Sequence, residues 1–169
     1  MNRKRWTVLV LALLIWAGSL LGCRAIARSR VREQYRSYAR QALSTEVLSC
    51  LHLTDAAIDE ALASGEPVSC AEIAQNFAVA AEMQRVLRNT YLRDEPGEVS
   101  VPYGVWLSCR ARIEALAGDG AEEQTAFFRA LGALCKEEKL SFDLPAGDDF
   151  EQKLTALEGK LTALLEEYD

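Results

Sequence analysis

The segment FEQKLTALEGKLTALLEEY, residues 150–168, contains the internal repeat of this sequence, KLTAL followed one heptad later by KLTAL. Its large apolar residues recur at alternating spacings of four and three, a pattern that keeps them on one side of an α-helix and is typical of a coiled-coil seam. We predict a helix over 149–167. It is either one more helix of a bundle or a surface for a partner or self-association through Phe150, Leu154, Leu157, Leu161 and Leu164.

Helical periodicity extends over most of the remaining chain and is interrupted by glycine and proline. Breaks at Gly65-Glu66-Pro67, at 94–97 and at 118–120 divide it into predicted helices over 28–64, 70–93, 104–117 and 121–139. Ser69 and Glu72 have the spacing of a capping box at the start of the second helix. A threonine can cap a helix, so a break of the first helix near Thr54 is an alternative.

No run alternates as a β-strand does, and the segment 140–145 is predicted as a loop that lays Phe142 on the core. The predicted fold is all-α: an N-terminal membrane segment followed by a four- or five-helix bundle. The expected parts are an anchor or signal over 1–23, a basic juxtamembrane helix over 24–43 and a bundle over 44–169 that ends in the heptad-patterned helix.

The N-terminus has the layout of an export signal, because Arg3, Lys4 and Arg5 precede an uncharged run from Trp6 to Cys23. As a helix, this run would be roughly 27 Å long at about 1.5 Å per residue, close to the ~30 Å hydrocarbon core of a bilayer. Residues 1–23 are therefore predicted to be a signal or a membrane anchor.

The run ends in Leu20-Leu21-Gly22-Cys23, which resembles the lipobox of bacterial lipoproteins. The resemblance covers residues 1–23 only. It implies that the Cys23 sulfur carries a diacylglycerol and that cleavage before Cys23 makes it the new N-terminus. Leu21 stands where a smaller residue is commoner, and Arg24 follows the cysteine directly, so the sequence departs from the usual pattern at both positions.

Charge is divided unevenly along the chain. Residues 1–40 carry nine Arg or Lys against one acid, whereas 41–169 carry ten against twenty-four. Arginines recur every fourth residue after the apolar run, at Arg24, Arg28, Arg32, Arg36 and Arg40. We expect these arginines to contact anionic lipid headgroups. The alternative is that they form an ordinary solvated helix face. The acidic remainder argues against binding nucleic acid, whose phosphates require clustered cations.

The side of the membrane is indicated by two opposing signals. The export-type N-terminus favours an extracytoplasmic domain, which we take as the expectation. Six basic residues follow the run within 24–40 and three precede it, and the positive-inside rule then favours a cytoplasmic domain on an uncleaved anchor.

Side chains that carry catalysis or bind metals form no recognisable pattern. His52 is the one histidine, which excludes a two-histidine metal motif, and no C-x-x-C pair is present. Setting Cys23 aside leaves Cys50, Cys70, Cys109 and Cys135, an even number that permits two disulfides in an exported protein. Straight helices would hold Cys50 and Cys70 roughly 20 Å apart, too far for a disulfide.

We assign no catalytic residue, metal site or cofactor from the sequence. It favours a non-enzymatic, membrane-tethered helical interaction module of the bacterial cell envelope. The alternatives are a cytoplasmic-facing anchored adaptor and an enzyme, or enzyme subunit, whose site has no recognisable motif.

Overall fold

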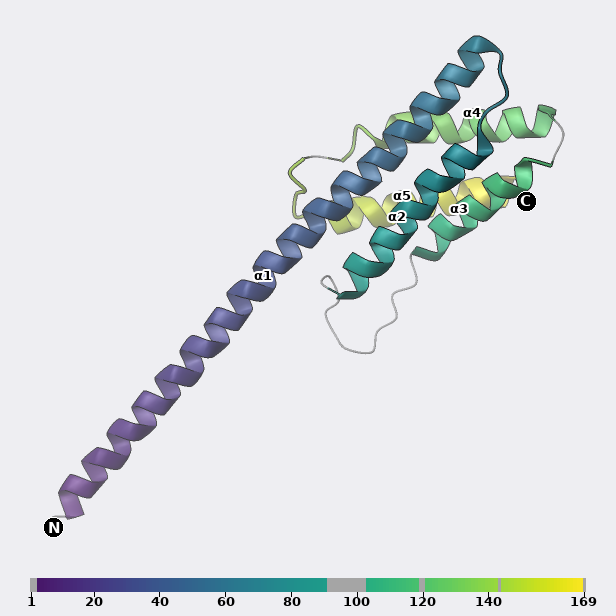
Figure 1. The fold of residues 1–169 in the computed structure, drawn as a ribbon. Coiled ribbons are helices and arrows are strands. Elements are labelled where there is room, and N and C mark those ends of the chain that lie inside the picture. The colour runs from purple at the N-terminus through teal and green to yellow at the C-terminus, as the bar shows by residue number, and fades with distance from the viewer. Residues whose placement is uncertain (1–2, 91–102, 119–120, 143, 169) are drawn as a thin grey trace. The chain divides into compact units, whose positions relative to one another are not determined.

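The computed structural model describes the backbone of residues 3–90, 103–118, 121–142 and 144–168; side chains are not described at 3–15, 17, 18, 20, 21, 25, 88–90, 103 and 121. Within these ranges lie five helices: α1 (Arg3–Ser64), α2 (Cys70–Thr90), α3 (Tyr103–Leu116), α4 (Ala121–Glu138) and α5 (Phe150–Glu167) (Figure 1). The described part contains no strand. The all-α prediction is confirmed.

The chain divides into two compact units, Met1–Ser37 and Tyr38–Asp169. Within the described residues, the first unit is the N-terminal part of α1. The second unit is a helical bundle made of the remainder of α1 and of α2 to α5, which agrees with the predicted bundle. It includes Tyr38, Arg40 and Gln41, which we had placed in the juxtamembrane helix from the sequence.

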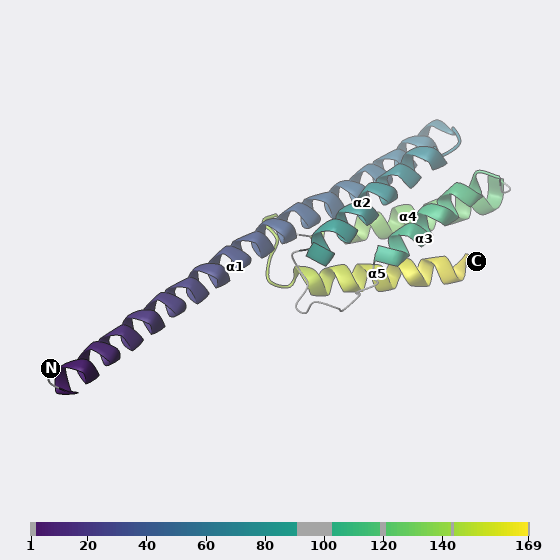
Figure 2. The same cartoon turned by 60° about the horizontal axis from the view of Figure 1, so that its bottom comes forward.

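Within the bundle, α2 runs back along α1, α3 runs back along α2, and α5 runs in the direction opposite to α4 (Figures 1 and 2). Helix α1 ends at Ser64, and the next residue, Gly65, has a φ of 72°, a left-handed conformation that residues with a side chain disfavour. Helix α2 begins at Cys70, as the Ser69–Glu72 spacing predicted, and its Ile73 N–H donates to the Ser69 carbonyl over 3.2 Å. Helix α3 packs on α2, and α5 packs on α3 and α4.

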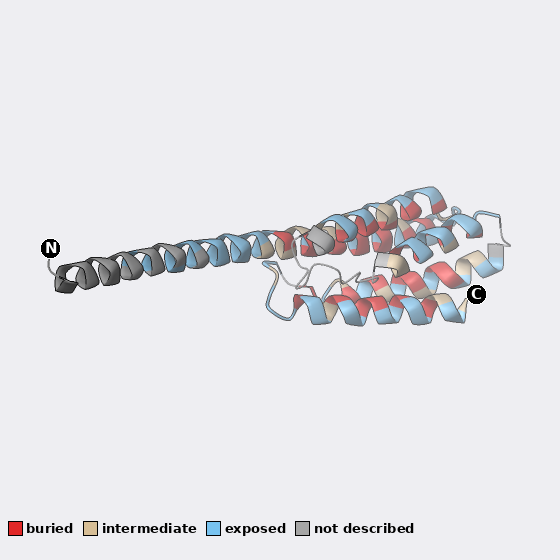
Figure 3. Ribbon diagram, turned by 90° about the horizontal axis from the view of Figure 1, so that it is seen from below, coloured by how far each residue is buried: buried red, intermediate tan, exposed pale blue. Residues whose placement is uncertain are grey.

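Buried side chains lie on the inward sides of the bundle helices (Figure 3). The largest are aromatic: Trp106, Phe77, Phe127, Phe128 and Phe150. Thr54 is fully buried inside an uninterrupted α1, so the alternative of a helix break at this position is wrong. The core-facing side of α1 carries Leu43, Val47, Leu51 and Ile58.

Helix α4 approaches α1 closely where it carries a glycine. A Cβ atom added to Gly132 would lie 3.1 Å from Cγ2 of Ile58, so a larger residue would push the helices apart. Two ion pairs add to this contact: Lys136 of α4 pairs with Asp59 over 3.5 Å, and Lys139, directly after α4, pairs with Asp55, whose side chain is buried. These contacts fix which side of α1 faces the bundle.

The segment between α4 and α5 lays Phe142 on the core, as predicted. Phe142 is buried and meets the Phe150 ring edge-on, with 6.0 Å between ring centroids. The Ala146 N–H donates to the Gln41 side-chain oxygen over 3.0 Å, which ties this loop to α1.

Candidate membrane-contact segment and partner surface

The five arginines predicted to contact lipid fall into different surroundings along α1. Arg24, Arg28 and Arg32 are exposed, whereas Arg36 is half-buried. Arg40 lies one heptad before the buried Val47 and therefore points toward the bundle. It forms ion pairs with Glu151 over 3.5 Å and with Asp148 at 4.0 Å. Arg40 thus joins α1 to the start of α5.

Large apolar side chains are exposed next to these arginines. Ile26, Val31 and Tyr35 are about half exposed, and Tyr38 is 75% exposed. In the sequence, Val31, Tyr35 and Tyr38 form a stripe at helical spacing, and all three side chains are exposed. Aromatic and basic side chains on one exposed helix are the combination found where helices meet lipid headgroups.

Cys23 is exposed on α1, and its thiol is free. In the part of the chain whose residues are described, no helix combines the length and the apolar character needed to cross a bilayer. Most side chains of the predicted signal or anchor, residues 1–23, lie outside the described residues.

The heptad seam of α5 is buried in the core of its own chain. Its five members are each at most 7% exposed: Phe150, Leu154, Leu157, Leu161 and Leu164. This is the arrangement expected of one more bundle helix. The same side chains are not on the surface, so a partner that meets the folded bundle has to bind other residues.

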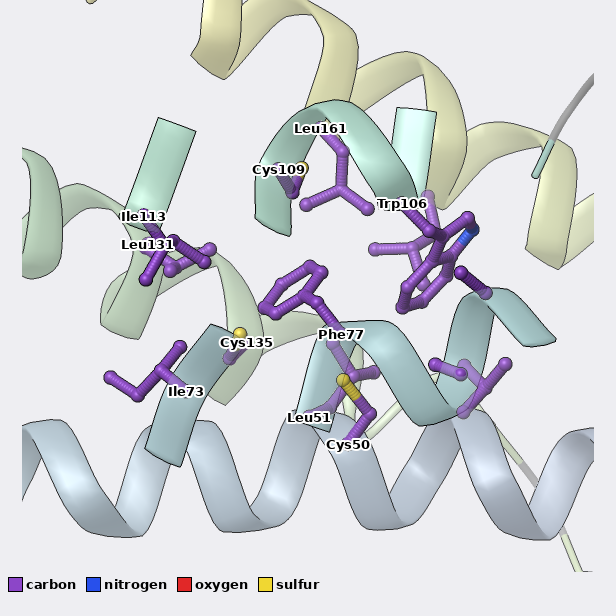
Figure 4. Packing of buried hydrophobic residues seen from close by; sticks show 14 of the residues in the cluster. Cys50, Leu51, Ile73, Phe77, Trp106, Cys109, Ile113, Leu131, Cys135 and Leu161 are labelled. Atoms are coloured by element: carbon purple, nitrogen blue, oxygen red, sulfur yellow. The ribbon is translucent and has the colours of Figure 1, made fainter. Parts of the chain in front are cut away.

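Three cysteines that are far apart in the sequence meet in the core. Cys50 of α1, Cys109 of α3 and Cys135 of α4 lie among Leu51, Phe77 and Trp106 (Figure 4). All are free thiols, as is Cys70. Burial raises the pKa of Cys109 to about 12, and burial with neighbouring thiols raises the pKa values of Cys50 and Cys135 well above the usual range. The reactive thiolate is therefore suppressed at these three sites.

A buried polar cluster joins three helices and was not predicted. The Trp106 indole on α3 donates to the Glu158 carboxylate on α5 over 3.3 Å. With its amide nitrogen directed at Glu158, Gln84 of α2 donates to the same oxygen over 2.9 Å, and its own oxygen accepts from Trp106 at 2.5 Å. All three are buried. The one signal for this cluster in the sequence is an acidic residue, Glu158, directly next to the seam residue Leu157 of α5.

A second buried carboxylate stands where α4 meets α5. Glu138 is buried at the end of α4, and Lys160 of α5 bridges it to the exposed Glu137, with 2.9 Å to the latter. These two carboxylates raise the pKa of Lys160, and the hydrogen bond that Lys160 donates to Glu138 contributes most. The ion pairs of Lys160 with Glu138 and Glu137 therefore connect α5 to the end of α4.

A shallow groove lies where α1 ends and α2 begins. Its volume is about 430 Å³, and its floor comes from α1: Leu53, Ala56, Ala57 and Ala61. Three carboxylates also line it: Glu60 from α1, Glu66 from the connecting loop and Glu72 from the first turn of α2. The groove was not predicted from the sequence, because alanines at a spacing of four are equally compatible with an ordinary helix face.

Residues able to bind a metal do not cluster in the described part of the chain, and His52 is exposed on α1. Comparison of the chain with protein families, with curated proteins and with solved structures finds no match. The features that bear on function are the exposed basic part of α1 and the surface of the bundle.

Proposed function

We propose that this chain is a membrane-tethered helical interaction module of the bacterial cell envelope, held by its N-terminus and presenting the bundle to a partner on the extracytoplasmic side. The observation that carries the proposal is the exposed part of α1 directly after the uncharged run: Arg24, Arg28 and Arg32, with Ile26, Val31 and Tyr35 beside them. Basic and aromatic side chains in this position suit an anionic lipid surface.

The tether is the run from Trp6 to Cys23, either as an uncleaved anchor or as a signal removed from a lipid-bearing Cys23. Exposure of Cys23 on α1 supports this assignment, since a lipid-modified sulfur has to be accessible. A diacylglycerol on Cys23 would place two acyl chains in the bilayer, and the basic segment that follows would add electrostatic attraction to anionic lipids.

The bundle supports the partner-binding part of the proposal through its surface rather than its core. Residues 41–169 carry twenty-four acids against ten basic residues, so this unit is strongly acidic. Its largest apolar side chains and all four of its thiols are buried, and the pKa is raised at three of them, chiefly by burial. A thiol enclosed in this core is mostly protonated and does not contact a substrate.

Two alternatives remain from the sequence. A cytoplasmic-facing anchored adaptor is favoured by the six basic residues after the run. An enzyme, or enzyme subunit, would assemble its site from polar residues that carry no motif.

Protease accessibility in intact cells and after lysis tests the tether and the side of the membrane together. The proposal expects the chain in the membrane fraction and the bundle digested in cells whose outer barrier is opened but whose inner membrane is intact. Digestion only after inner-membrane lysis would favour the adaptor, and recovery in the soluble fraction would reject the tether.

Labelling with a fatty-acid probe distinguishes the two forms of the tether. A lipid-bearing Cys23 predicts label on the wild type, none on Cys23→Ala and a mature chain without Asn2 to Arg5. An intact N-terminal peptide and no Cys23-dependent label would leave the uncleaved anchor.

A further inference from the structure

The groove between α1 and α2 is built from two rows of residues along α1, each with a spacing of four. One row is Leu53, Ala57 and Ala61, and the other is Ala56, Glu60 and Ser64. Rows of this spacing form the ridges and grooves by which helices pack on one another. Because the members are mostly small, they leave a channel into which the ridge of another helix fits.

The channel is open and its apolar part is not covered. Ala61 is buried and Ala57 half-buried, whereas Leu53, Ala56 and Ser64 are exposed, Leu53 to 51%. A volume of about 430 Å³ is in the range of ligand sites, about 300–1,000 Å³, but an enclosed pocket would bury its lining residues. An open channel with a small-residue floor suits a helix lying along it.

The charged side chains around the channel are all negative. Glu60, Glu66 and Glu72 line it from three successive segments, and none of them forms an ion pair with another described residue. Some exposed acids elsewhere on the bundle are paired, as Glu82 is with Arg85 and Glu114 with Arg110. The three carboxylates of the groove are therefore available to cations from outside the described chain.

We propose that this groove binds an amphipathic helix of a partner protein, with a short apolar face against Leu53, Ala57 and Ala61 and with Lys or Arg on both flanks. The apolar face would bury the exposed floor, and the flanking cations would meet Glu60 on one side and Glu66 and Glu72 on the other. This deepens the proposed function, on which it rests, by naming the chemistry of the partner.

The test uses the full chain in non-ionic detergent and a fluorescent helical peptide of fourteen residues, with Leu at positions i, i+4 and i+7 and Lys on both flanks, at low ionic strength. Fluorescence anisotropy gives the Kd. Exposed ion pairs are worth about 0.2–1 kcal/mol each, so Glu60→Gln, Glu66→Gln and Glu72→Gln together should weaken binding on the order of tenfold. Ala56→Lys, which places a cation in the channel, should weaken it at least as much.

Matched controls lie on α4 and α5, which do not line the groove. Glu166 and Glu167 with Glu122 of α4 are exposed acids, and their triple change to Gln removes the same charge; Ala156→Lys adds the same cation at an exposed alanine. These variants should bind within about twofold of the wild type, and a peptide with Glu in place of Lys should not bind.

Equal weakening by the groove and control variants would overturn the proposal, because the peptide would then respond only to the net charge. Absence of wild-type binding would overturn it as well. Since the measurement is made in detergent, its failure is separate from failure of the tether, which protease accessibility reports.

Discussion

The Trp106 indole donates a hydrogen bond to Glu158 across the core, with 3.3 Å between Nε1 and Oε1, and both side chains are buried. The bond joins α3 to α5, and Gln84 brings α2 to the same carboxylate. A buried donor that loses its acceptor costs about 1–3 kcal/mol. This cluster therefore favours one arrangement of the three helices over alternatives in which the same apolar faces meet in another register.

Removing the shared acceptor is expected to destabilise the bundle. Glu158→Ala removes the acceptor of the Gln84 amide and leaves the Trp106 N–H with the Gln84 oxygen alone, so it should lower the free energy of unfolding by about 1–3 kcal/mol. Glu158→Gln retains an acceptor oxygen and should cost less than half of that. Urea unfolding followed by circular dichroism measures both. The exposed Glu166→Ala serves as the control, and equal losses for Glu158→Ala and Glu166→Ala would contradict the role assigned to the cluster.

Two glycines should respond in opposite directions to alanine. Gly65 has a φ of 72°, where a side chain costs about 1 kcal/mol or more, so Gly65→Ala should lower the free energy of unfolding. A Cβ on Gly159, inside α5, would meet nothing within 4 Å. Because alanine has a higher helix propensity than glycine, Gly159→Ala should raise the free energy of unfolding by about 0.5–1 kcal/mol. Chemical denaturation of both variants checks the pair, and a change of the same sign in each would refute the reasoning.

Burial of the core thiols predicts a loss of stability in alkali. The pKa of Cys109 is about 12 in the fold against 9.0 for an ordinary thiol, so the neutral form is favoured when folded. A raised pKa contributes stability that is complete below pH 9 and is lost as the pH rises toward 12. The free energy of unfolding should therefore fall from pH 9 to 11 more steeply in the wild type than in Cys109→Ala. Identical slopes would show that Cys109 does not contribute.

The exposed arginines of α1 should determine binding to lipid. A peptide of residues 24–43 is expected to bind anionic vesicles and to release them as salt is raised, since each basic residue near such a surface is worth about 1 kcal/mol. Changing Arg24, Arg28 and Arg32 to Gln should reduce its partition coefficient on the order of a hundredfold or more. Vesicle sedimentation measures this, with neutral vesicles as the control. Equal binding to both kinds of vesicle would reject the lipid contact.

The positions of the helices were predictable because their signals are local. Apolar residues every three or four positions and the breaks at Gly65 to Pro67 and at Gly118 place each helix to within a few residues, apart from the ends that fall outside the described residues. The N-terminal start of α1 is the exception. We predicted a start at residue 28 from helical periodicity, while the helix extends back through the apolar run to Arg3.

By itself the sequence determined the all-α class, the helix boundaries, the uneven division of charge and the absence of a recognisable catalytic motif, since each depends on residues close together in the chain. Only the tertiary structure decided that the apolar seam of α5 is buried in the core of its own chain and that Arg40 pairs with Glu151. It also decided that three cysteines share the core, Cys50, Cys109 and Cys135, and that three glutamates line one groove, Glu60, Glu66 and Glu72. These relations depend on which helix faces which. Periodicity fixes the apolar side of each helix but not the neighbour that covers it, because many pairings bury similar apolar area and the choice among them rests on specific polar contacts and close fits such as Gly132 against Ile58.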